Sequence, residues 1–265
     1  MKLNRSLVLT VLAISPTVAV AQGDATSPIC TDRPTKANAA CTVPAGRLQI
    51  ESDLYNWART KSGASSATSV AFVNPTLKYG LDSRSDLQVN WAPVVRIKTD
   101  TLGATTQRTD VGDVVVRYKR RLSADGARVQ WGLIPFVKIP TAPLGVGNGR
   151  WEGGVAAPVN IALADGVTLT FGPEVDIFSE ADGTGRRVNM VNLVNVAKAY
   201  GKATFYAEFW SATDFAAETG GDQRSVDFAV AYLLGPRLQV DLGVNIGLNP
   251  NTPDVQAYAG VSHRF

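Results

Sequence analysis

Residues 255–265 read Val-Gln-Ala-Tyr-Ala-Gly-Val-Ser-His-Arg-Phe, and this C-terminal stretch decides the fold. Small or apolar residues at Val255, Ala257, Ala259 and Val261 alternate with residues of another kind. A period of two predicts a strand whose two faces differ. Chain ends fray unless they are tied down, so a strand in this position needs neighbours on both sides. A closed barrel provides them, because its last strand pairs with its first.

Segments with the same period follow one another from Arg47 onward, and each has about the 9–11 residues with which a tilted strand crosses a bilayer. The clearest is 85–98, where Leu87 and Val89 oppose Gln88 and Asn90. The least clear is 187–199, whose asparagines fall on both phases. The predicted strands are 47–58, 69–80, 85–98, 111–122, 127–139, 151–163, 166–178, 187–199, 202–211, 224–234, 237–248 and 255–265.

Short and long connections alternate between these strands. The gaps 81–84, 123–126, 164–165, 200–201 and 235–236 are short and rich in Gly, Asp and Ser. The gaps 59–68, 99–110, 140–150, 179–186, 212–223 and 249–254 are mostly longer. This alternation is typical of outer-membrane barrels, which have short periplasmic turns and long external loops. The sequence therefore predicts an all-β fold over residues 47–265, a transmembrane antiparallel up-and-down β-barrel of about 12 strands.

The composition fits a barrel better than a helical membrane protein. The chain has 265 residues, of which 45% are hydrophobic and 18% charged, and its mean hydropathy is +0.01. No stretch is apolar over the roughly 18 residues that a membrane helix requires. Aromatic residues near the predicted strand ends fit the girdles that barrels place at membrane interfaces: Tyr79, Tyr118, Trp131, Trp151, Tyr232 and Phe265.

The N-terminus has the three parts of a secretory signal peptide. They are a basic start with Lys2 and Arg5, an apolar stretch at 7–14, and an A-x-A cleavage site at 19–21. We expect residues 1–21 to be removed on export, and the exported barrel to reside in the outer membrane of a Gram-negative bacterium. Without the two N-terminal basic residues, 24 basic residues stand against 23 acidic ones. This balance does not favour nucleic-acid binding.

Residues 22–46 contain three prolines and show no clear period. We expect a periplasmic N-terminal segment that is either a small plug at the barrel mouth or a disordered tether. Cys30 and Cys41 lie in this segment, and the oxidising compartment reached by export favours a disulfide between them. No histidine is near them, so we expect neither a zinc site nor any other metal or cofactor.

Four stretches carry a resemblance to a known family. They are CTDRPTKANAACTVPAGRLQIESDLYNW from Cys30, VGDVVVRYKRRL, PFVKIPTAP and the final AYAGVSHRF. Together they resemble the outer-membrane transporters grouped with the MetA pathway of phenol degradation, and the resemblance covers essentially the whole mature chain. Its most specific parts are Asp32-Arg33-Pro34 and the stretch 43–47. The resemblance implies an outer-membrane barrel that passes small, often aromatic or hydrophobic compounds, and it supplies no catalytic residues.

The predicted strand phases direct polar side chains toward the lumen, with basic residues on earlier strands and most acidic residues on later ones. In an open pore, two oppositely charged walls would orient dipolar solutes and set ion selectivity. Alternatively, the charges form a salt-bridge network that fills a narrow lumen. The candidate lumen-lining residues are Lys78, Arg96, Lys98, Asp113, Arg117, Lys119, Arg128, Lys138, Glu152, Glu174, Asp176, Glu208, Asp227 and Asp241.

An outer-membrane lipid hydrolase is the alternative from another functional class. His263 and Ser52 share the outward phase of strands that should be neighbours, and a hydroxyl beside an imidazole can form a nucleophile. No Asn or Asp on that face is placed to orient the histidine, so the channel is the preferred interpretation. The glycine-rich stretch 145–154 lacks the Lys-Ser/Thr of a phosphate-binding loop, and we expect an external loop there.

The C-terminal strand also resembles the signal by which the barrel-assembly machinery recognises its clients. The residues that carry this resemblance are Tyr258, Gly260, His263 and Phe265, although His263 stands where an apolar or aromatic residue is usual. The partners expected for this chain are therefore outer-membrane lipids, the assembly machinery and a small-molecule permeant.

Overall fold

The computed structural model describes residues 28–180, 183–215 and 221–265. The predicted signal peptide, 1–21, and the first residues of the predicted N-terminal segment lie outside the described residues. Within the described ranges, no helix has the length and apolarity needed to cross a membrane.

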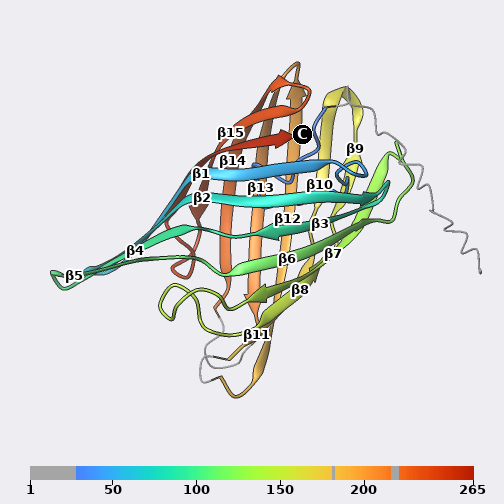
Figure 1. The fold of residues 1–265 in the computed structure, drawn as a ribbon. Helices are drawn as coiled ribbons and strands as arrows, with labels where there is room; N and C mark the ends of the chain where they lie inside the picture. Colours follow the sequence, from blue (N-terminus) through green and yellow to red (C-terminus); the bar gives the residue numbers. More distant parts are fainter. Residues whose placement is uncertain (1–27, 181–182, 216–220) are drawn as a thin grey trace, which may run out of the picture.

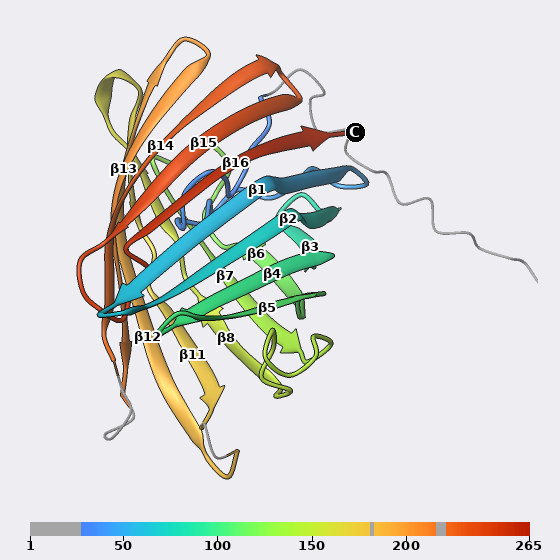
Figure 2. The same ribbon diagram turned by 90° about the vertical axis from the view of Figure 1, so that its left-hand side faces the viewer.

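The strands form one antiparallel sheet that closes on itself, because β1 pairs with both β2 and β16 (Figure 1 and Figure 2). Four of the twelve barrel strands are each interrupted once, which gives sixteen strand segments. This confirms the predicted twelve-stranded antiparallel barrel. The segments are β1 (Leu48–Ser62), β2 (Ser65–Asp82), β3 (Ser85–Asn90), β4 (Val94–Thr101), β5 (Ala104–Asp110), β6 (Val114–Arg121), β7 (Val129–Ile139), β8 (Glu152–Ala156), β9 (Val159–Ala162), β10 (Val167–Phe171), β11 (Glu174–Ser179), β12 (Arg186–Tyr200), β13 (Ala203–Asp214), β14 (Gln223–Gly235), β15 (Leu238–Gly247) and β16 (Val255–Arg264); a 3-10 turn, η1, spans Ala164–Gly166.

Prolines and glycines mark the four interruptions, which separate β3 from β4, β5 from β6, β8 from β9, and β10 from β11. Proline has no N–H to donate to a ladder, so a strand breaks around it. Neighbouring backbone groups still pair across the breaks: Trp91 N donates to Pro75 O at 3.1 Å, and Ala157 N donates to Pro173 O at 2.8 Å. The wall therefore bends at these points without opening.

Burial in this barrel is the reverse of that in a water-soluble protein. Most of the buried side chains are polar or charged, including Lys119, Asp86, Gln88 and Asp227, each 2% exposed or less. Large apolar side chains such as Leu242 and Phe205 are instead exposed on the outside. A surface of this kind suits hydrocarbon, whereas the polar interior suits water and ion pairs. All six aromatic residues predicted near strand ends are exposed: Tyr79, Tyr118, Trp131, Trp151, Tyr232 and Phe265.

Two predicted loops are in fact strand, since 59–68 and 99–110 are largely taken up by β-hairpins. The hairpin of β1 and β2 turns at 63–64, and that of β4 and β5 turns at 102–103, where both residues have positive φ. Figure 1 shows β4 and β5 extending beyond the body of the barrel. Their side chains face water on both sides, so the apolar alternation that identifies a membrane strand is missing there.

The inward and outward faces are exchanged at neighbouring positions in β1, in β2 and in the interruption after β3. A bulge at Leu54 lets Asp53 and Asn56 both face the interior, where the Asn56 amide donates to Asp53 at 3.0 Å. Val73, which lies opposite Leu54, has a φ of 51°. An irregularity of this kind exchanges the two faces of a strand, because side chains alternate with a period of two.

Candidate functional site: a charged segment inside the barrel

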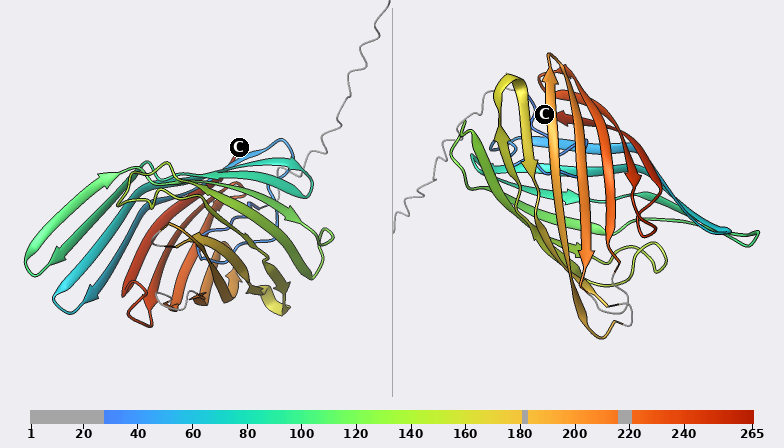
Figure 3. Two further views of the ribbon diagram at one scale, coloured as in Figure 1. Left: turned by 90° about the horizontal axis from the view of Figure 1, so that it is seen from below. Right: turned by 180° about the vertical axis from the view of Figure 1, so that it is seen from behind.

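Residues 28–46 run through the interior of the barrel (Figure 3, left, blue). Ile29 N donates to Pro236 O, in the β14–β15 turn, at 2.7 Å. Val43 N donates to Asp86 on β3 at 2.9 Å, and Ala45 bridges to Gly80 on β2. Both limbs are thus attached near the short-turn end of the barrel, and the residues between them reach into the lumen as a loop. We call residues 28–46 the inner segment.

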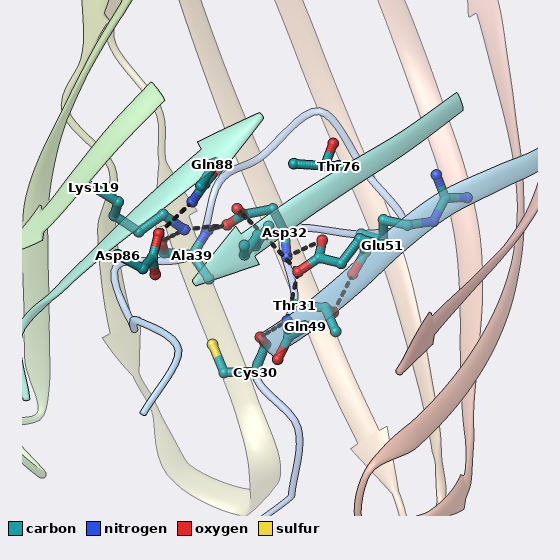
Figure 4. A network of polar contacts seen from close by, with 12 residues as sticks. Cys30, Thr31, Asp32, Ala39, Gln49, Glu51, Thr76, Asp86, Gln88 and Lys119 are labelled. Carbon is teal, nitrogen blue, oxygen red and sulfur yellow. Dashed lines mark hydrogen bonds and ion pairs between the residues drawn. The ribbon is translucent and has the colours of Figure 1, made fainter. Parts of the chain in front are cut away.

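Asp32 binds the basic side of the wall (Figure 4). Its carboxylate oxygens lie 2.5 Å from Lys78 Nζ and 2.6 Å from Lys119 Nζ. Both ammonium groups are almost fully buried, with 4% and 2% of their side chains exposed. Burial alone would raise the pKa of Asp32, but Lys119 and Lys78 outweigh it and hold the pKa below its usual range. Asp32 is therefore ionised and neutralises two buried cations.

Arg33, the next residue, binds the acidic side of the wall. Its Nη1 lies 2.5 Å from Asp53 Oδ1, and its Nη2 and Nε donate to Asp241 at 2.7 and 3.2 Å. The fork-like contact with Asp241 is the geometry that makes an arginine–carboxylate pair strong and directional. The guanidinium also lies 5.8 Å from the ring centroid of Tyr258.

Lys36 forms a third contact, with β13 and β14. Its Nζ donates to Asp227 Oδ2 and to Ser225 Oγ, both at 2.7 Å, and lies 4.5 Å from the ring centroid of Trp210. The two oxygens of Glu208 accept the backbone N–H groups of Lys36 and Ala37, each at 3.1 Å. Main chain and side chain are therefore both fixed at this point.

The inner segment is complementary in charge to the wall around it. Asp32 meets the lysines of β2 and β6, whereas Arg33 and Lys36 meet the carboxylates of β1, β14 and β15. Because each charge of the inner segment pairs with wall charges of opposite sign, these ions avoid the large cost of being buried unpaired. The arrangement holds the segment in one register.

Five of the fourteen residues predicted to line the lumen contact the inner segment: Lys78, Lys119, Glu208, Asp227 and Asp241. Three others, Arg117, Glu174 and Asp176, line a cavity next to it. Three more form a separate cluster, in which Lys138 Nζ lies 3.1 Å from Asp113 and 3.0 Å from Glu152. Arg128 donates to Ala162 O and lines a second cavity.

Arg96 and Lys98 lie elsewhere than the sequence predicts. The Arg96 guanidinium stands 5.7 Å from the ring of Phe72, which packs against Tyr55, an outer-surface residue that is 43% exposed. Lys98 pairs with Asp100 at 3.1 Å with almost half of its side chain exposed. The phase change along β1, β2 and the β3–β4 interruption places both residues on the face opposite to Gln88 and Asn90.

Sequence reasoning missed the three charged residues of the inner segment as site residues, and also Trp210 and Ser225. Asp32, Arg33 and Lys36 lie in a stretch without a period, so no strand phase assigns them a direction. A signal was present, because they are the only charged side chains among the small and uncharged residues of 28–46.

Two cavities meet at the inner segment. The larger, of about 720 Å³, extends toward the long-loop end, where Arg187, Asp214 and Asn251 line it. The smaller, of about 370 Å³, extends toward the short-turn end and is lined mainly by Ala, Thr and Asn side chains of the wall. Four residues of the segment line both cavities: Asp32, Arg33, Thr35 and Asn38. The segment thus forms the partition between them.

Cys30 and Cys41 form the predicted disulfide, which joins the two limbs of the inner segment. A cross-link of this length limits the conformations of the undocked segment and stabilises the docked state, by about 2 kcal/mol if its contribution is at the low end of the usual range. We expect the double variant C30S/C41S to assemble normally but to show brief, frequent increases of single-channel current. A current as quiet as that of the wild type would contradict this role.

Two residues of the predicted assembly signal face the inner segment. Tyr258 is buried beside Arg33, and a Cβ added to Gly260 would overlap the Arg33 guanidinium. The close approach of Arg33 thus gives a second reason for glycine at position 260. His263 and Phe265 instead pack ring against ring, with centroids 4.5 Å apart.

The variant G260A tests these two explanations for the glycine separately. If Gly260 makes room for Arg33, the added methyl group will displace the guanidinium from Asp241 and raise the conductance, while the folded yield stays unchanged. If Gly260 serves assembly, the folded yield will fall instead. Heat-modified electrophoretic mobility measures the folded fraction, and A259G on the outward face of the same strand is the matched control.

Ser52 and His263 show no contact with each other among the described interactions. The Ser52 hydroxyl donates to Asp53 O at 2.7 Å, and the His263 ring packs against Phe265. The glycine-rich stretch 145–154 contains a loop and the start of β8, with an isolated bridge between Leu144 and Gly147. In the described part of the chain, no group of three or more His, Cys, Asp or Glu residues is arranged to hold a metal ion.

Comparisons with known proteins place these features in context. Residues 31–265 match the model of the family described as "Putative MetA-pathway of phenol degradation". The fold is similar to that of an outer membrane channel from Pseudomonas putida F1, with 13% identity over 85% of this chain and 98% of that one and a TM-score of 0.68. It is also similar to the NanC porin, with 12% identity over 82% and 98% of the two chains and a TM-score of 0.52. Among curated protein sequences, none matches.

Proposed function

Because this chain belongs to the family described as "Putative MetA-pathway of phenol degradation", we propose that it is an outer-membrane channel for passive passage of small polar solutes. The inner segment would set the width and charge of its narrowest part. The observation that carries the proposal is the position of Asp32, Arg33, Thr35 and Asn38 between two cavities that extend toward opposite ends of the barrel. A barrel of twelve strands leaves room for such a passage, unlike the fully packed eight-stranded barrels.

The lining of the larger cavity supports polar rather than purely hydrophobic permeants. Charged and amide side chains dominate it, and its aromatic residues are Phe178 and Trp210. Solutes with an aromatic ring and a polar or charged group suit this mixture, since the ring can stack while the polar group is hydrated or paired. The resemblance to transporters of aromatic compounds agrees with this narrower class.

The exposed apolar belt supports insertion into the outer membrane, with lipids as the surrounding partner. We also propose the barrel-assembly machinery as a partner, on the strength of the C-terminal Tyr258 to Phe265 pattern. The phase and packing of Phe265 agree with such a role, because its N–H extends the β1 ladder at Leu48 while its ring remains half exposed.

Liposome swelling tests the proposed transport. Vesicles that contain the refolded protein should swell faster than empty vesicles in arabinose, in glycine and in benzoate, and the rate should fall from arabinose to sucrose. Swelling no faster than that of empty vesicles with every solute would contradict the channel and support a structural barrel closed by the inner segment.

A further inference from the structure

The wall around Lys36 is built like a binding site for an ammonium ion. A carboxylate oxygen of Asp227 and the hydroxyl of Ser225 both lie 2.7 Å from Lys36 Nζ. The Trp210 ring stands 4.5 Å from the same atom, within the range of a favourable cation–π contact. These three wall residues come from two adjacent strands, β13 and β14, and are held by the ladder between Trp210 and Ser225.

The site is deeply buried on its wall side. Asp227 and Ser225 are each 1% exposed. Asp227 Oδ1 is also buried and accepts no hydrogen bond among the described residues. One oxygen of the Asp227 carboxylate therefore remains available as an acceptor when Lys36 occupies the site. An ammonium group has three donors, and a free one can turn to use all the acceptors, whereas Lys36 Nζ is tethered to its backbone.

The cation in the site belongs to the inner segment and not to the wall. Lys36 and Trp210 both line the larger cavity, and 28% of the Lys36 side chain is exposed. A solute in that cavity can therefore reach the aromatic face beside Nζ. Asp32 and Arg33 are bound to other strands, so the side chain of Lys36 can leave the site while the rest of the segment stays attached.

We propose that Asp227, Ser225 and Trp210 form a binding site for organic ammonium ions and that Lys36 occupies it as an internal ligand. A permeant with a primary ammonium group competes with Lys36 Nζ, takes its place and loosens the tip of the inner segment, which Glu208 then holds through the backbone alone. This inference rests on the proposed function for its effect on passage, but the binding site itself does not depend on conduction.

Binding of ethylammonium, which matches the end of a lysine side chain, tests the site directly. Saturation-transfer NMR on detergent-refolded protein measures it without any flow through the barrel. The variant K36A, with the site empty, should bind ethylammonium at least about tenfold more tightly than the wild type, which corresponds to about 1.4 kcal/mol of competition by Lys36. The longer, neutral variant K36Q should also bind ethylammonium more tightly than the wild type.

Matched controls identify the wall residues. K36A/D227N should lose the binding gained in K36A, whereas K36A/D176N should keep it, because Asp176 lines the same cavity and bonds to Asn189 instead. Ethanol, the neutral analogue, should not bind to any variant. Equal ethylammonium binding by the wild type, K36A and K36A/D227N would overturn the proposal.

Conductance then tests whether displacement of Lys36 loosens the segment. Ethylammonium chloride should raise the single-channel conductance of the wild type above its value in sodium chloride of equal conductivity, and this rise should be absent in D227N. If ethylammonium binds K36A as expected but no variant conducts, the channel function fails and the site stands. If all variants conduct and none binds ethylammonium, the site fails and the channel stands.

Discussion

Replacing Asp32 with asparagine should release the inner segment and increase its cleavage by trypsin by about two orders of magnitude. The neutral amide leaves Lys119 and Lys78 without a carboxylate that now lies within 2.6 Å of both. Breaking a buried ion pair by removing one partner costs about 3–5 kcal/mol. We expect about 3 kcal/mol, at the lower end of that range, because Lys78 keeps its ion pair with Glu51. Cleavage should be followed at the peptide bond after Lys36. The bond after Arg33 is protected from trypsin because proline follows it.

Two further variants show whether the buried cations cause the effect. D32N/K119M should recover part of the loss, because a neutral apolar side chain then replaces the unpaired Lys119. D125N is the matched control: Asp125 pairs with Arg121 at the surface, and its loss should have little effect. A cleavage rate in D32N equal to that in D125N would contradict the account.

The lowered pKa of Asp32 fixes the pH range of this effect. A carboxyl whose folded pKa lies below its ordinary value stabilises the docked state above the ordinary value and loses that contribution as the pH falls toward the folded pKa. Release of the segment in D32N should also raise the conductance, and this difference between the wild type and D32N should persist from pH 7 to pH 5. It should begin to shrink only below about pH 4, near the ordinary pKa of an aspartate.

Deleting residues 28–44 should produce the largest change in conductance. The inner segment separates cavities of about 720 and 370 Å³, and without it they would join into one water-filled lumen. We expect single-channel conductance to rise severalfold and solutes of disaccharide size to pass. The wall charges would then face water, so the barrel itself should remain folded.

The selectivity of the deletion variant adds a sharper test. Removal of Asp32, Arg33 and Lys36 exposes Asp53, Asp227 and Asp241 together on one side of the lumen. A ring or wall of carboxylates favours cations. The reversal potential in a salt gradient should therefore shift toward cation selectivity, and D227N in the same background should reduce the shift. Wild-type conductance and selectivity in the deletion variant would show that the segment does not restrict the lumen.

The sequence defines the barrel well because alternation is a local property. The final strand 255–265, the strand 85–90 and the short turns all follow from periods and turn residues that adjacent positions reveal. Alternation does not predict the polar hairpins at 59–68 and 99–110, because outside the membrane neither face needs to be apolar. Alternation also places Arg96 and Lys98 on the wrong face, because irregularities near Leu54, Val73 and Pro93 exchange the two faces.

Local sequence patterns do not predict the position of the inner segment. Its position depends on contacts between residues far apart in sequence, such as Arg33 with Asp241 and Lys36 with Asp227. No period in 22–46 encodes them, so the sequence does not distinguish a plug from a tether. The strand phases nevertheless predict the two charged walls. The charges of Asp32, Arg33 and Lys36 have the signs needed to pair with them.

Hydrogen exchange of the wild-type inner segment tests the central claim most directly. Five of its backbone N–H groups donate to side chains of the barrel wall: Asp32 to Glu51, Lys36 and Ala37 to Glu208, Ala40 to Asn160, and Val43 to Asp86. Amides in docked structure exchange only when it opens, so peptides from 28–46 should retain these protons long after an unstructured peptide has lost them. Exchange of the whole segment at the rate of an unstructured peptide, in a barrel that is otherwise protected, would contradict the account.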